Sequence, residues 1–250
     1  MESAAIIDTG NLTKQYGKQT AVKDLSFKVA EGEIFGFLGP NGAGKTTTIL
    51  MLLGLTRPSA GYARVCGMDP LRDAREVKRI VGYLPENVGF YGDLNAFQSL
   101  HYIADLNGIP LRKRLERIGR SLETVGLTEH SQKKVGTFSR GMKQRLGIAE
   151  VLLKEPRVMI LDEPTLGLDP EGALQLIELI QSLNRERKIT VLISSHNLSQ
   201  VQKISHKVGI MIKGAMVASG SIDSLAKASF GVADGGYSLE EIYMKYFQEG

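Results

Sequence analysis

Residues 39–46 constrain this chain more than any other stretch, because they fit G-x-x-x-x-G-K-[ST], the pattern of a phosphate-binding loop. The apolar run before it, 34–38, predicts a buried strand, and the run after it, 47–53, predicts a helix. The glycines let backbone N–H groups turn inward around phosphate oxygens, and the helix N-terminus adds partial positive charge. Lys45 supplies a full charge to the β and γ phosphates, and the Thr46 hydroxyl can ligate Mg²⁺. We therefore expect a strand–loop–helix unit that binds a nucleoside triphosphate.

The composition is that of an ordinary globular protein, with 42% hydrophobic and 23% charged residues among 250. No apolar run reaches the ~18 residues that a membrane-spanning helix needs, and the N-terminus has no basic region followed by an apolar core. The single cysteine, Cys66, cannot form an internal disulfide or a metal cluster, so a small buried residue is the better interpretation. These features predict a cytoplasmic protein.

The net charge of +4 is mildly basic, and the densest basic cluster lies at 112–120. Helical spacing spreads these charges over more than one face, Glu116 interrupts them, and no aromatic residues interleave to stack on bases. A solvated helix surface is therefore favoured over a patch that binds nucleic acid or lipid headgroups, and we expect no nucleic-acid partner.

Strand and helix signals alternate along the chain. Strands are predicted at 6–14, 20–29, 62–65, 80–84, 158–161 and 190–193, and a short helix at 75–79. From about 90 to 153 the pattern is helical and rich in Leu, Lys and Arg, which indicates a helical insertion. Asp169 and Pro170 offer an N-cap and a first-turn proline for a later helix, and the stretch 239–247 is amphipathic. Strands that alternate with helices predict an α/β fold with a mostly parallel sheet.

Two carboxylates, Asp162 and Glu163, end the apolar run 158–161. A buried strand that ends in acids places them at the carboxyl edge of the sheet, where α/β proteins bind ligands. Asp162 can hold Mg²⁺, directly or through water, and Glu163 would face the γ-phosphate and polarise an attacking water. A strand that ends at a solvated turn gives the same pattern, but the position about 120 residues after the phosphate-binding loop favours the catalytic interpretation.

Two further features are less specific. His196 ends the run 192–195, one strand beyond the two acids, so its imidazole could donate to the γ-phosphate and signal its presence; a lone histidine there is more often structural. Ser139 is a good N-cap for a helix that runs to about residue 153, and Gly141 permits close backbone approach. That helix start is a candidate second anion-binding terminus, although these residues alone favour an ordinary capped helix.

In order and spacing, these motifs resemble those of the ATP-binding subunit of an ABC transporter, and the resemblance covers nearly the whole chain. Residues 39–46 match Walker A, and 162–163 match Walker B with its catalytic glutamate. Residues 139–142 resemble the signature motif, 166–169 the D-loop, His196 the H-loop switch, and Tyr16 the A-loop aromatic that stacks on adenine. The resemblance implies that the nucleotide is contacted by Tyr16, Gly39, Pro40, Asn41, Gly42, Ala43, Gly44, Lys45, Thr46, Thr47, Ser139, Gly141 and Asp169.

The signature region departs from the family pattern at some of its places. It keeps Ser139 and Gly141 but has Phe138, Arg140 and Met142 at the others, which still allows a capped helix start.

The expected Q-loop glutamine is also absent, because Glu86 stands at the aligned place after the strand 80–84. A carboxylate can ligate Mg²⁺ but repels the γ-phosphate, so Glu86 is a third candidate metal ligand beside Thr46 and Asp162. Alternatively, Glu86 is a surface residue and Asn87 reaches into the site instead.

The resemblance implies a P-loop NTPase (RecA-like) core with a mostly parallel sheet, an N-terminal antiparallel β subdomain and a helical signature subdomain. The ABC ATPase domain is expected at 1–220, with the core and β subdomain in 1–88 and 154–220 and the helical subdomain at about 89–153. Residues 221–250 would form a short C-terminal extension.

The resemblance further implies ATP and Mg²⁺ as cofactors, with Glu163, His196 and Lys45 as the catalytic residues. In this family, one nucleotide lies between the phosphate-binding loop of one subunit and the signature helix of another. We therefore expect a homodimer closed by ATP and opened by hydrolysis, with membrane permease subunits as partners and a peripheral position on the inner face of the cell membrane.

Several runs indicate a branch of the family. Residues 40–47, 82–86, 139–145 and 238–242 resemble the ABC-2-type export ATPases of bacteria and archaea, which implies outward movement of drugs, lipids, polysaccharides or peptides. Residues 83–91 are also similar to the ATPase of copper-enzyme maturation transporters of the nitrous-oxide reductase type.

Two alternative functions remain open at this point. A soluble ABC-type ATPase of DNA repair or translation would usually carry long coiled coils, zinc modules or a second cassette, and the chain shows none of these. A small-molecule P-loop kinase or a GTPase would need no signature helix, and no Asn-Lys-x-Asp guanine motif is present.

Overall fold

The structure is a computed structural model that describes residues 5–230 and 237–249. Its centre is a six-stranded sheet whose strands, in spatial order, are β5 (Val81–Leu84), β6 (Val158–Asp162), β7 (Thr190–Ser195), β3 (Ile34–Leu38), β8 (Lys207–Ile212) and β9 (Ala215–Gly220). The strands from β5 to β8 pair in parallel, and β9 runs antiparallel to β8 at one edge. The mostly parallel sheet predicted from the sequence is confirmed.

A separate three-stranded antiparallel sheet is built from the N-terminal part of the chain. Its strands are ordered β2 (Gln19–Ala30), β1 (Ala5–Tyr16) and β4 (Ala60–Val65). These strands confirm the predicted runs at 6–14, 20–29 and 62–65, and with them the expected antiparallel β region.

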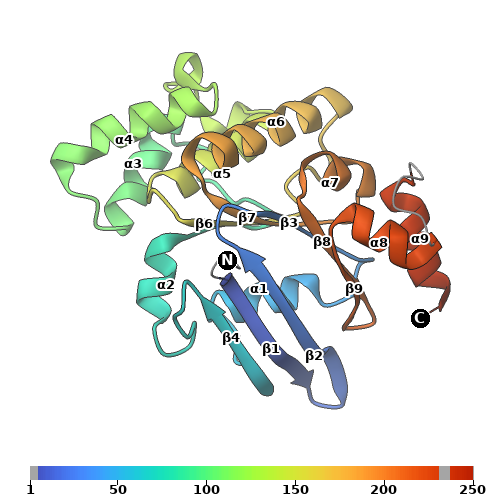
Figure 1. Cartoon of the computed structure of the whole chain (residues 1–250). Coiled ribbons are helices and arrows are strands. Elements are labelled where there is room, and N and C mark those ends of the chain that lie inside the picture. Colours follow the sequence, from blue (N-terminus) through green and yellow to red (C-terminus); the bar gives the residue numbers. More distant parts are fainter. Residues whose placement is uncertain (1–4, 231–236, 250) are drawn as a thin grey trace.

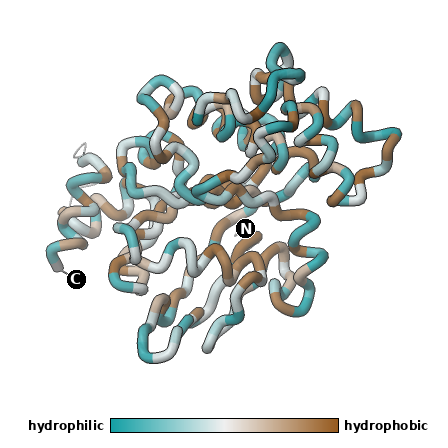
Figure 2. The backbone as a smooth tube through the Cα atoms, turned by 180° about the vertical axis from the view of Figure 1, so that it is seen from behind, coloured by the Kyte–Doolittle hydropathy of each residue, from teal (hydrophilic) through white to brown (hydrophobic). Residues whose placement is uncertain are grey.

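The central sheet is buried on both faces, and this is why its strands are almost wholly apolar. Alternate residues of β6 point to opposite sides: Val158 and Ile160 pack with the antiparallel sheet and α1 (Lys45–Leu52), whereas Met159 and Leu161 pack with the helical side. Figure 1 shows these layers, with α1 and the antiparallel sheet on one side of the central sheet. The helices on the other side are α3 (Ala96–Leu106), α4 (Leu111–Thr124), α5 (Arg140–Leu152) and α6 (Pro170–Arg187). Figure 2 shows hydrophobic residues gathered at the centre of the molecule and hydrophilic ones in the outer loops.

The helical insertion predicted at about 90–153 contains α3 (Ala96–Leu106), α4 (Leu111–Thr124) and α5 (Arg140–Leu152), with short 3-10 turns at Thr128–His130 and Val135–Thr137. A capping box explains where α3 begins, because Asn95 and Gln98 bond each other's backbone N–H groups. In the part of the chain that the structure describes, no helix is long and apolar enough to cross a bilayer.

Two helix limits differ from the sequence expectation. The helix α1 begins at Lys45 rather than at residue 47, and it ends at Leu52. Ile80, which was expected to begin a strand, is instead the last residue of α2 (Ala74–Ile80), and β5 starts at Val81. The apolar run misled the assignment because Val77, Ile80 and Val81 all pack into the same core on either side of the helix–strand junction.

The helix α5 lies unusually close to β5 and the loop that follows it. A Cβ at Gly147 would lie 2.5 Å from Leu84 Cδ1, and a Cβ at Gly82 would lie 2.2 Å from Val151 Cγ1. Both distances are too short for non-bonded carbon atoms, so a larger residue at either position would force the Leu84 or Val151 side chain to move. The second half of α5 is therefore packed directly against the parallel sheet.

The C-terminal part of the chain packs onto β8 and the end of β3. Leu225 of α8 (Ile222–Phe230) and Ile242 of α9 (Leu239–Glu249) share a core cluster with Leu38, with Ile210 and with Val201 of α7 (Leu198–Ile204). The amphipathic stretch predicted at 239–247 is thus a helix whose apolar face is buried. The predicted limits of the helical subdomain and of the C-terminal extension stay predictions.

Candidate functional site

The loop between β3 and α1 has a backbone that requires glycine. Gly42 and Gly44 have φ angles of +80° and +100°, which favour glycine over residues with a side chain. A Cβ at Gly44 would also lie only 2.5 Å from the carbonyl oxygen of Ala21, and one at Gly39 would lie 2.5 Å from that of Met211. The loop is therefore wedged between β2 and the end of β8, and it presents the first turn of α1 to one cavity.

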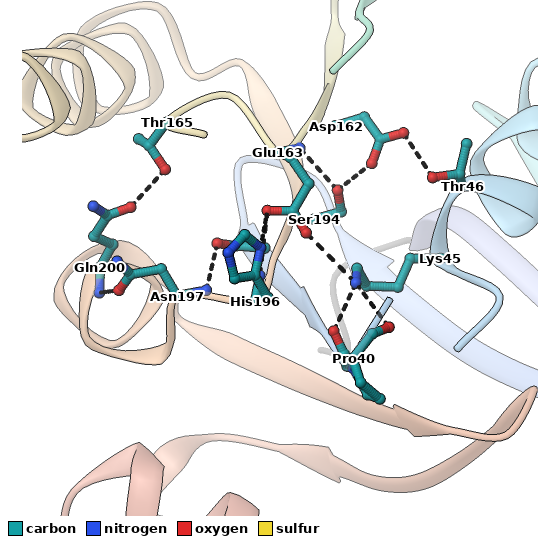
Figure 3. A network of polar contacts seen from close by, with 12 residues as sticks. Pro40, Lys45, Thr46, Asp162, Glu163, Thr165, Ser194, His196, Asn197 and Gln200 are labelled. Atoms are coloured by element: carbon teal, nitrogen blue, oxygen red, sulfur yellow. Dashed lines mark hydrogen bonds and ion pairs between the residues drawn. The ribbon is translucent and has the colours of Figure 1, made fainter. Parts of the chain in front are cut away.

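Lys45 is the first residue of α1, and its side chain is almost fully buried. Its Nζ donates to the carbonyl oxygens of Gly39, at 2.6 Å, and Pro40, at 3.3 Å, and lies 3.5 Å from Oε1 of Glu163. Figure 3 shows the ammonium group between the loop carbonyls and the acid. The loop thus holds a full positive charge beside the N-terminus of a helix, the arrangement that binds phosphate groups.

Thr46 and Asp162 meet although they lie 116 residues apart in the chain. The Thr46 hydroxyl donates to Oδ2 of Asp162 at 2.9 Å, and Oδ1 of the same carboxylate accepts from the hydroxyl of Ser194. Two of the three side chains predicted as metal ligands, Thr46 and Asp162, are therefore adjacent (Figure 3). Hydroxyl and carboxylate oxygens are the donors that Mg²⁺ prefers.

Glu163 follows β6 with a left-handed backbone, at a φ of +48°. Such a conformation costs a residue with a side chain about 1–3 kcal/mol and recurs at functional sites. The carboxylate lies close to the two other residues predicted to be catalytic: Oε2 lies 2.8 Å from Nδ1 of His196, and Oε1 lies 3.5 Å from Nζ of Lys45. Glu163 is buried and lines the cavity, whereas His196 is about half exposed and contacts the acid without lining the cavity itself.

One cavity of about 630 Å³ brings together most of the residues predicted to contact the nucleotide. This volume is in the range of small-molecule sites. Tyr16 lies at its edge, half exposed, with the ammonium of Lys14 4.7 Å from its ring centroid. The lining residues are Tyr16, Gln19, Thr20, Ala21, Pro40, Asn41, Gly42, Ala43, Gly44, Lys45, Thr46, Thr47, Glu86, Glu163, Lys213 and Gly214.

Glu86, whose side chain is exposed, lines both this cavity and a neighbouring cavity of about 250 Å³ beside Arg140 and Lys143, whereas Asn87 lines the neighbouring cavity and not this one. Burial, together with the negative charges of Asp162 and Glu86, raises the pKa of Tyr83 to about 12. The Glu86 carboxylate and Asp162 therefore both lie within electrostatic reach of one phenol at the end of β5. Glu86 is thus a surface residue that borders the cavity of the phosphate-binding loop, and Asn87 does not line that cavity; the role of Glu86 as a metal ligand stays a prediction.

The signature residues gather in a different place. Ser139 caps α5, and its Oγ accepts from the N–H of Met142 at 3.2 Å, as predicted. Asp169 caps α6 (Pro170–Arg187) in the same way, with Pro170 in the first turn. Ser139, Gly141 and Asp169 line one cavity of about 270 Å³ that shares no lining residue with the cavity around Lys45. The structure thus separates the predicted nucleotide contacts into two groups.

Two contributors were not predicted from the sequence. Ser194 joins the two acids, and the β8–β9 turn brings Lys213 and Gly214 to the wall of the larger cavity. Ser194 could have been found by counting back from His196, since parallel pairing of β6 and β7 places residue 194 beside Asp162. No local pattern in the sequence indicates that Lys213 returns to the phosphate-binding loop.

Comparison with known proteins finds relatives named as ATP-binding proteins, which agrees with the presence of a phosphate-binding loop. The family model described as "ABC transporter" matches residues 22–166, which is more than half of the chain. The bacitracin transport ATP-binding protein BcrA of Bacillus licheniformis is 46% identical over 224 residues, which cover 90% of this chain and 72% of that protein. The linearmycin resistance ATP-binding protein LnrL of Bacillus subtilis (strain 168) is 38% identical over 216 residues, covering 86% of this chain and 69% of that protein.

Solved structures show the same similarity. A structure described as the ATP-binding subunit of an ABC transporter has a TM-score of 0.84 and 30% identity, covering 97% of this chain and 99% of its own. A dimeric ATP-binding cassette, MJ0796, in a post-hydrolysis state bound to ADP and Pi, has a TM-score of 0.76. At 22% identity, with 86% of this chain and 98% of that chain covered, the second similarity concerns the fold.

Proposed function

This chain belongs to the ABC transporter family, and from that premise we propose how its two cavities divide the work of ATP hydrolysis between two copies of the chain. The protein is the ATP-binding subunit of an ABC transporter, and its ATPase activity powers movement of a substrate. The kinase, GTPase, DNA-repair and translation alternatives lose their support, because the matched relatives are named for transport and resistance.

ATP binds in the larger cavity. The loop amides, the helix dipole of α1 and the Lys45 ammonium receive its phosphates, and Tyr16 at the rim stacks on the base. Lys45 now contacts two carbonyls and Glu163, so phosphate oxygens would replace contacts that already hold the ammonium in place.

Mg²⁺ would be held by Thr46 and Asp162, with Glu86 as a third oxygen ligand. The observed contact between Thr46 Oγ1 and Asp162 Oδ2, at 2.9 Å, supports this assignment because it brings two hard oxygen donors together beside the loop. Within residues 5–230 and 237–249, no group of three or more His, Cys, Asp or Glu side chains could hold a metal. That fits Mg²⁺, which is usually bound by one or two carboxylates together with substrate phosphates, and which supplies charge neutralisation there.

Hydrolysis depends on the buried carboxylate of Glu163. It polarises the water that attacks the γ-phosphate, while Lys45 neutralises charge on the phosphate oxygens. His196 would orient Glu163 through the 2.8 Å contact, and its half-exposed imidazole would donate to the γ-phosphate when the nucleotide is bound. We expect Lys45→Ala to lose most ATPase activity, and a fully active variant would contradict the assignment of the loop.

The separation of the two cavities is the observation that supports a dimer. Ser139 and Gly141 form an anion-binding helix start that does not line the cavity of Lys45 in the same chain. A second copy can supply this helix start to the first copy's nucleotide, and two copies then enclose two nucleotides. Closure would follow ATP binding, and opening would follow loss of the γ-phosphate charge.

A dimerisation assay tests this arrangement. Glu163→Gln should bind ATP without hydrolysing it and elute as a dimer on gel filtration with ATP and Mg²⁺, but as a monomer with ADP. In that background, Ser139→Asn and Ser139→Asp both retain an N-cap residue, and only the second places a negative charge against the partner's phosphates. We expect Ser139→Asn to remain dimeric and Ser139→Asp to be monomeric. A Glu163→Gln protein that stays monomeric with ATP would overturn the proposal.

The subunit works with integral-membrane permease subunits at the inner face of the cell membrane, and the proposed direction is export. Support comes from relatives named for bacitracin transport and linearmycin resistance, which suggest that the cargo is a toxic compound of that kind. Deleting the gene for this chain from its host cell should increase sensitivity to bacitracin or linearmycin. Re-expressing the wild-type chain should restore resistance, and re-expressing the Lys45→Ala variant should not. Unchanged sensitivity to both compounds would contradict the proposed cargo, and failure to co-purify with any membrane protein would contradict the proposed partners.

A further inference from the structure

We propose that Ser194 is a positioning residue for ATP hydrolysis, because its hydroxyl fixes the side chain of Asp162 and the backbone of Glu163 relative to each other. The inference rests on the roles proposed above for these two acids. Ser194 itself is fully buried and does not line the cavity of Lys45, so it acts through its neighbours.

The pairing of β6 and β7 places Ser194 next to both acids. Ser194 and Asp162 are paired residues in the parallel ladder, so their side chains leave the sheet on the same side. The Ser194 hydroxyl donates to Oδ1 of Asp162, and its oxygen accepts from the backbone N–H of Glu163 at 3.0 Å. One side chain of β7 thus bridges the last residue of β6 and the residue after it.

The two contacts determine how the hydroxyl is oriented. A carboxylate oxygen can only accept, and a backbone N–H can only donate, so the single proton of Ser194 must point at Asp162. The other oxygen of Asp162 accepts from Thr46 at 2.9 Å. The carboxylate is therefore held from both sides, which fixes the direction of the oxygen beside the phosphate-binding loop.

The hydrogen bond from the Glu163 N–H to the Ser194 hydroxyl helps to hold the Glu163 backbone in its left-handed conformation. Its left-handed φ of +48° is unfavourable for a residue with a side chain, and its N–H is held by both the carbonyl oxygen of Ser194, at 3.1 Å, and the hydroxyl. A change at this backbone would move the carboxylate away from His196 and Lys45. Removing the hydroxyl should therefore disturb catalysis more than nucleotide binding.

Two matched pairs of variants test the proposal. Ser194→Ala removes the hydroxyl from the wild-type residue, and Ser194→Thr and Ser194→Val have nearly the same shape as each other but differ in the hydroxyl. Ser99→Ala is the control, because Ser99 is also buried but its hydroxyl has no hydrogen-bond partner among the described residues. The measurements on the full chain are kcat and KM for ATP with Mg²⁺, metal-free affinity for a fluorescent ATP analogue, and the thermal midpoint.

We expect Ser194→Ala to lower kcat roughly tenfold to a hundredfold. This factor corresponds to the free energy of one hydrogen bond to a charged group. Its KM and its metal-free affinity should stay within about twofold of the wild type, because the phosphate-binding loop is unchanged. Ser194→Thr should have a kcat at least about tenfold above that of Ser194→Val, by the same hydrogen-bond estimate. Ser99→Ala should match the wild type.

The proposal is overturned if Ser194→Ala keeps the wild-type kcat, or if Thr and Val at this position are equally active. It is also overturned if kcat, metal-free affinity and thermal midpoint all fall together, because that describes a general packing defect. Glu163→Gln serves as the reference. An inactive Glu163→Gln beside a fully active Ser194→Ala removes the role of Ser194 alone, whereas a fully active Glu163→Gln removes the proposed catalytic site itself.

Discussion

Nδ1 of His196 lies 2.8 Å from Oε2 of Glu163, so the residues that follow two adjacent parallel strands contact each other (Figure 3). The backbone N–H of His196 points at the same oxygen, at 3.3 Å. These two contacts hold one oxygen of the buried carboxylate, and the other oxygen lies 3.5 Å from Nζ of Lys45.

His196→Ala should therefore lower kcat roughly tenfold to a hundredfold by freeing the Glu163 carboxylate, while nucleotide affinity changes little. Steady-state ATPase assays and a fluorescent-nucleotide titration measure the two effects. His130→Ala is the matched control, because His130 is exposed in a 3-10 turn away from the cavity. An ATPase rate of His196→Ala equal to that of His130→Ala would contradict the role of the imidazole.

Gly42 and Gly44, two of the positive-φ glycines of the loop, should differ in their tolerance of a methyl group. Gly42→Ala meets open space, so only the left-handed backbone penalises it, by about 1–2 kcal/mol of unfolding free energy. Gly44→Ala also places its Cβ 2.5 Å from the Ala21 carbonyl oxygen, so we expect a loss of about 3 kcal/mol or more together with loss of ATP binding. Urea unfolding and nucleotide titration check this order, and similar behaviour of the two variants would argue against the close contact between the loop and strand β2.

Glu150 should make stability depend on pH. Burial raises the pKa of this carboxyl on α5 to about 8, from an ordinary value near 4.5. At a pH between these two values, the Glu150 carboxyl is protonated in the folded protein and ionised in the unfolded chain. The unfolding free energy therefore falls as pH rises from about 4.5 to about 8. Glu150→Gln removes this dependence.

We expect the unfolding free energy of Glu150→Gln to match that of the wild type near pH 5 and to exceed it by about 1–3 kcal/mol at pH 8.5. Urea unfolding at several pH values measures the difference. Glu178→Gln, on the exposed face of α6, should show no such trend. A difference between Glu150→Gln and the wild type that is constant across pH would contradict burial of the carboxyl.

The C-terminal helix α9 should contribute to the unfolding free energy, because it packs against the rest of the domain. Ile242 is fully buried against the cluster that contains Leu38, so Ile242→Ala should lower the unfolding free energy by about 2–5 kcal/mol. Met244, two residues later and about half exposed, provides the control, and Met244→Ala should change stability by less than about 0.5 kcal/mol. Equal stability of the two variants would show that α9 does not pack as described.

The sequence predicted the site best where the chemistry is local. The phosphate-binding loop and its flanking strand and helix follow from one continuous pattern, and the Asp162–Glu163 pair follows from a buried strand that ends in acids. Caps at Ser139 and Asp169 were also predictable, because an N-cap depends on one residue and the turn after it.

Features that depend on distant pairing could not be predicted in the same way. The local sequence pattern did not indicate α7, β8, β9 or α8. Their apolar runs are short, and the reason for them is visible only in the fold, where they pack against Leu38 and against one another. The role of Ser194 depends on the register between β6 and β7, and Lys213 reaches the cavity through a turn between β8 and β9. In each case the informative neighbour lies far away in the chain.

The glycine contact between α5 and β5 limits where this molecule can bend. Only hydrogen atoms fit between Gly147 and the side chain of Leu84, and Val151 fills the space over Gly82 in the same way. Sliding of the helix over the strand would require the Leu84 or Val151 side chain to move aside. A swing of Ser139 during the ATPase cycle is therefore expected to carry the Glu86 segment with it or to arise from a hinge within the first half of α5.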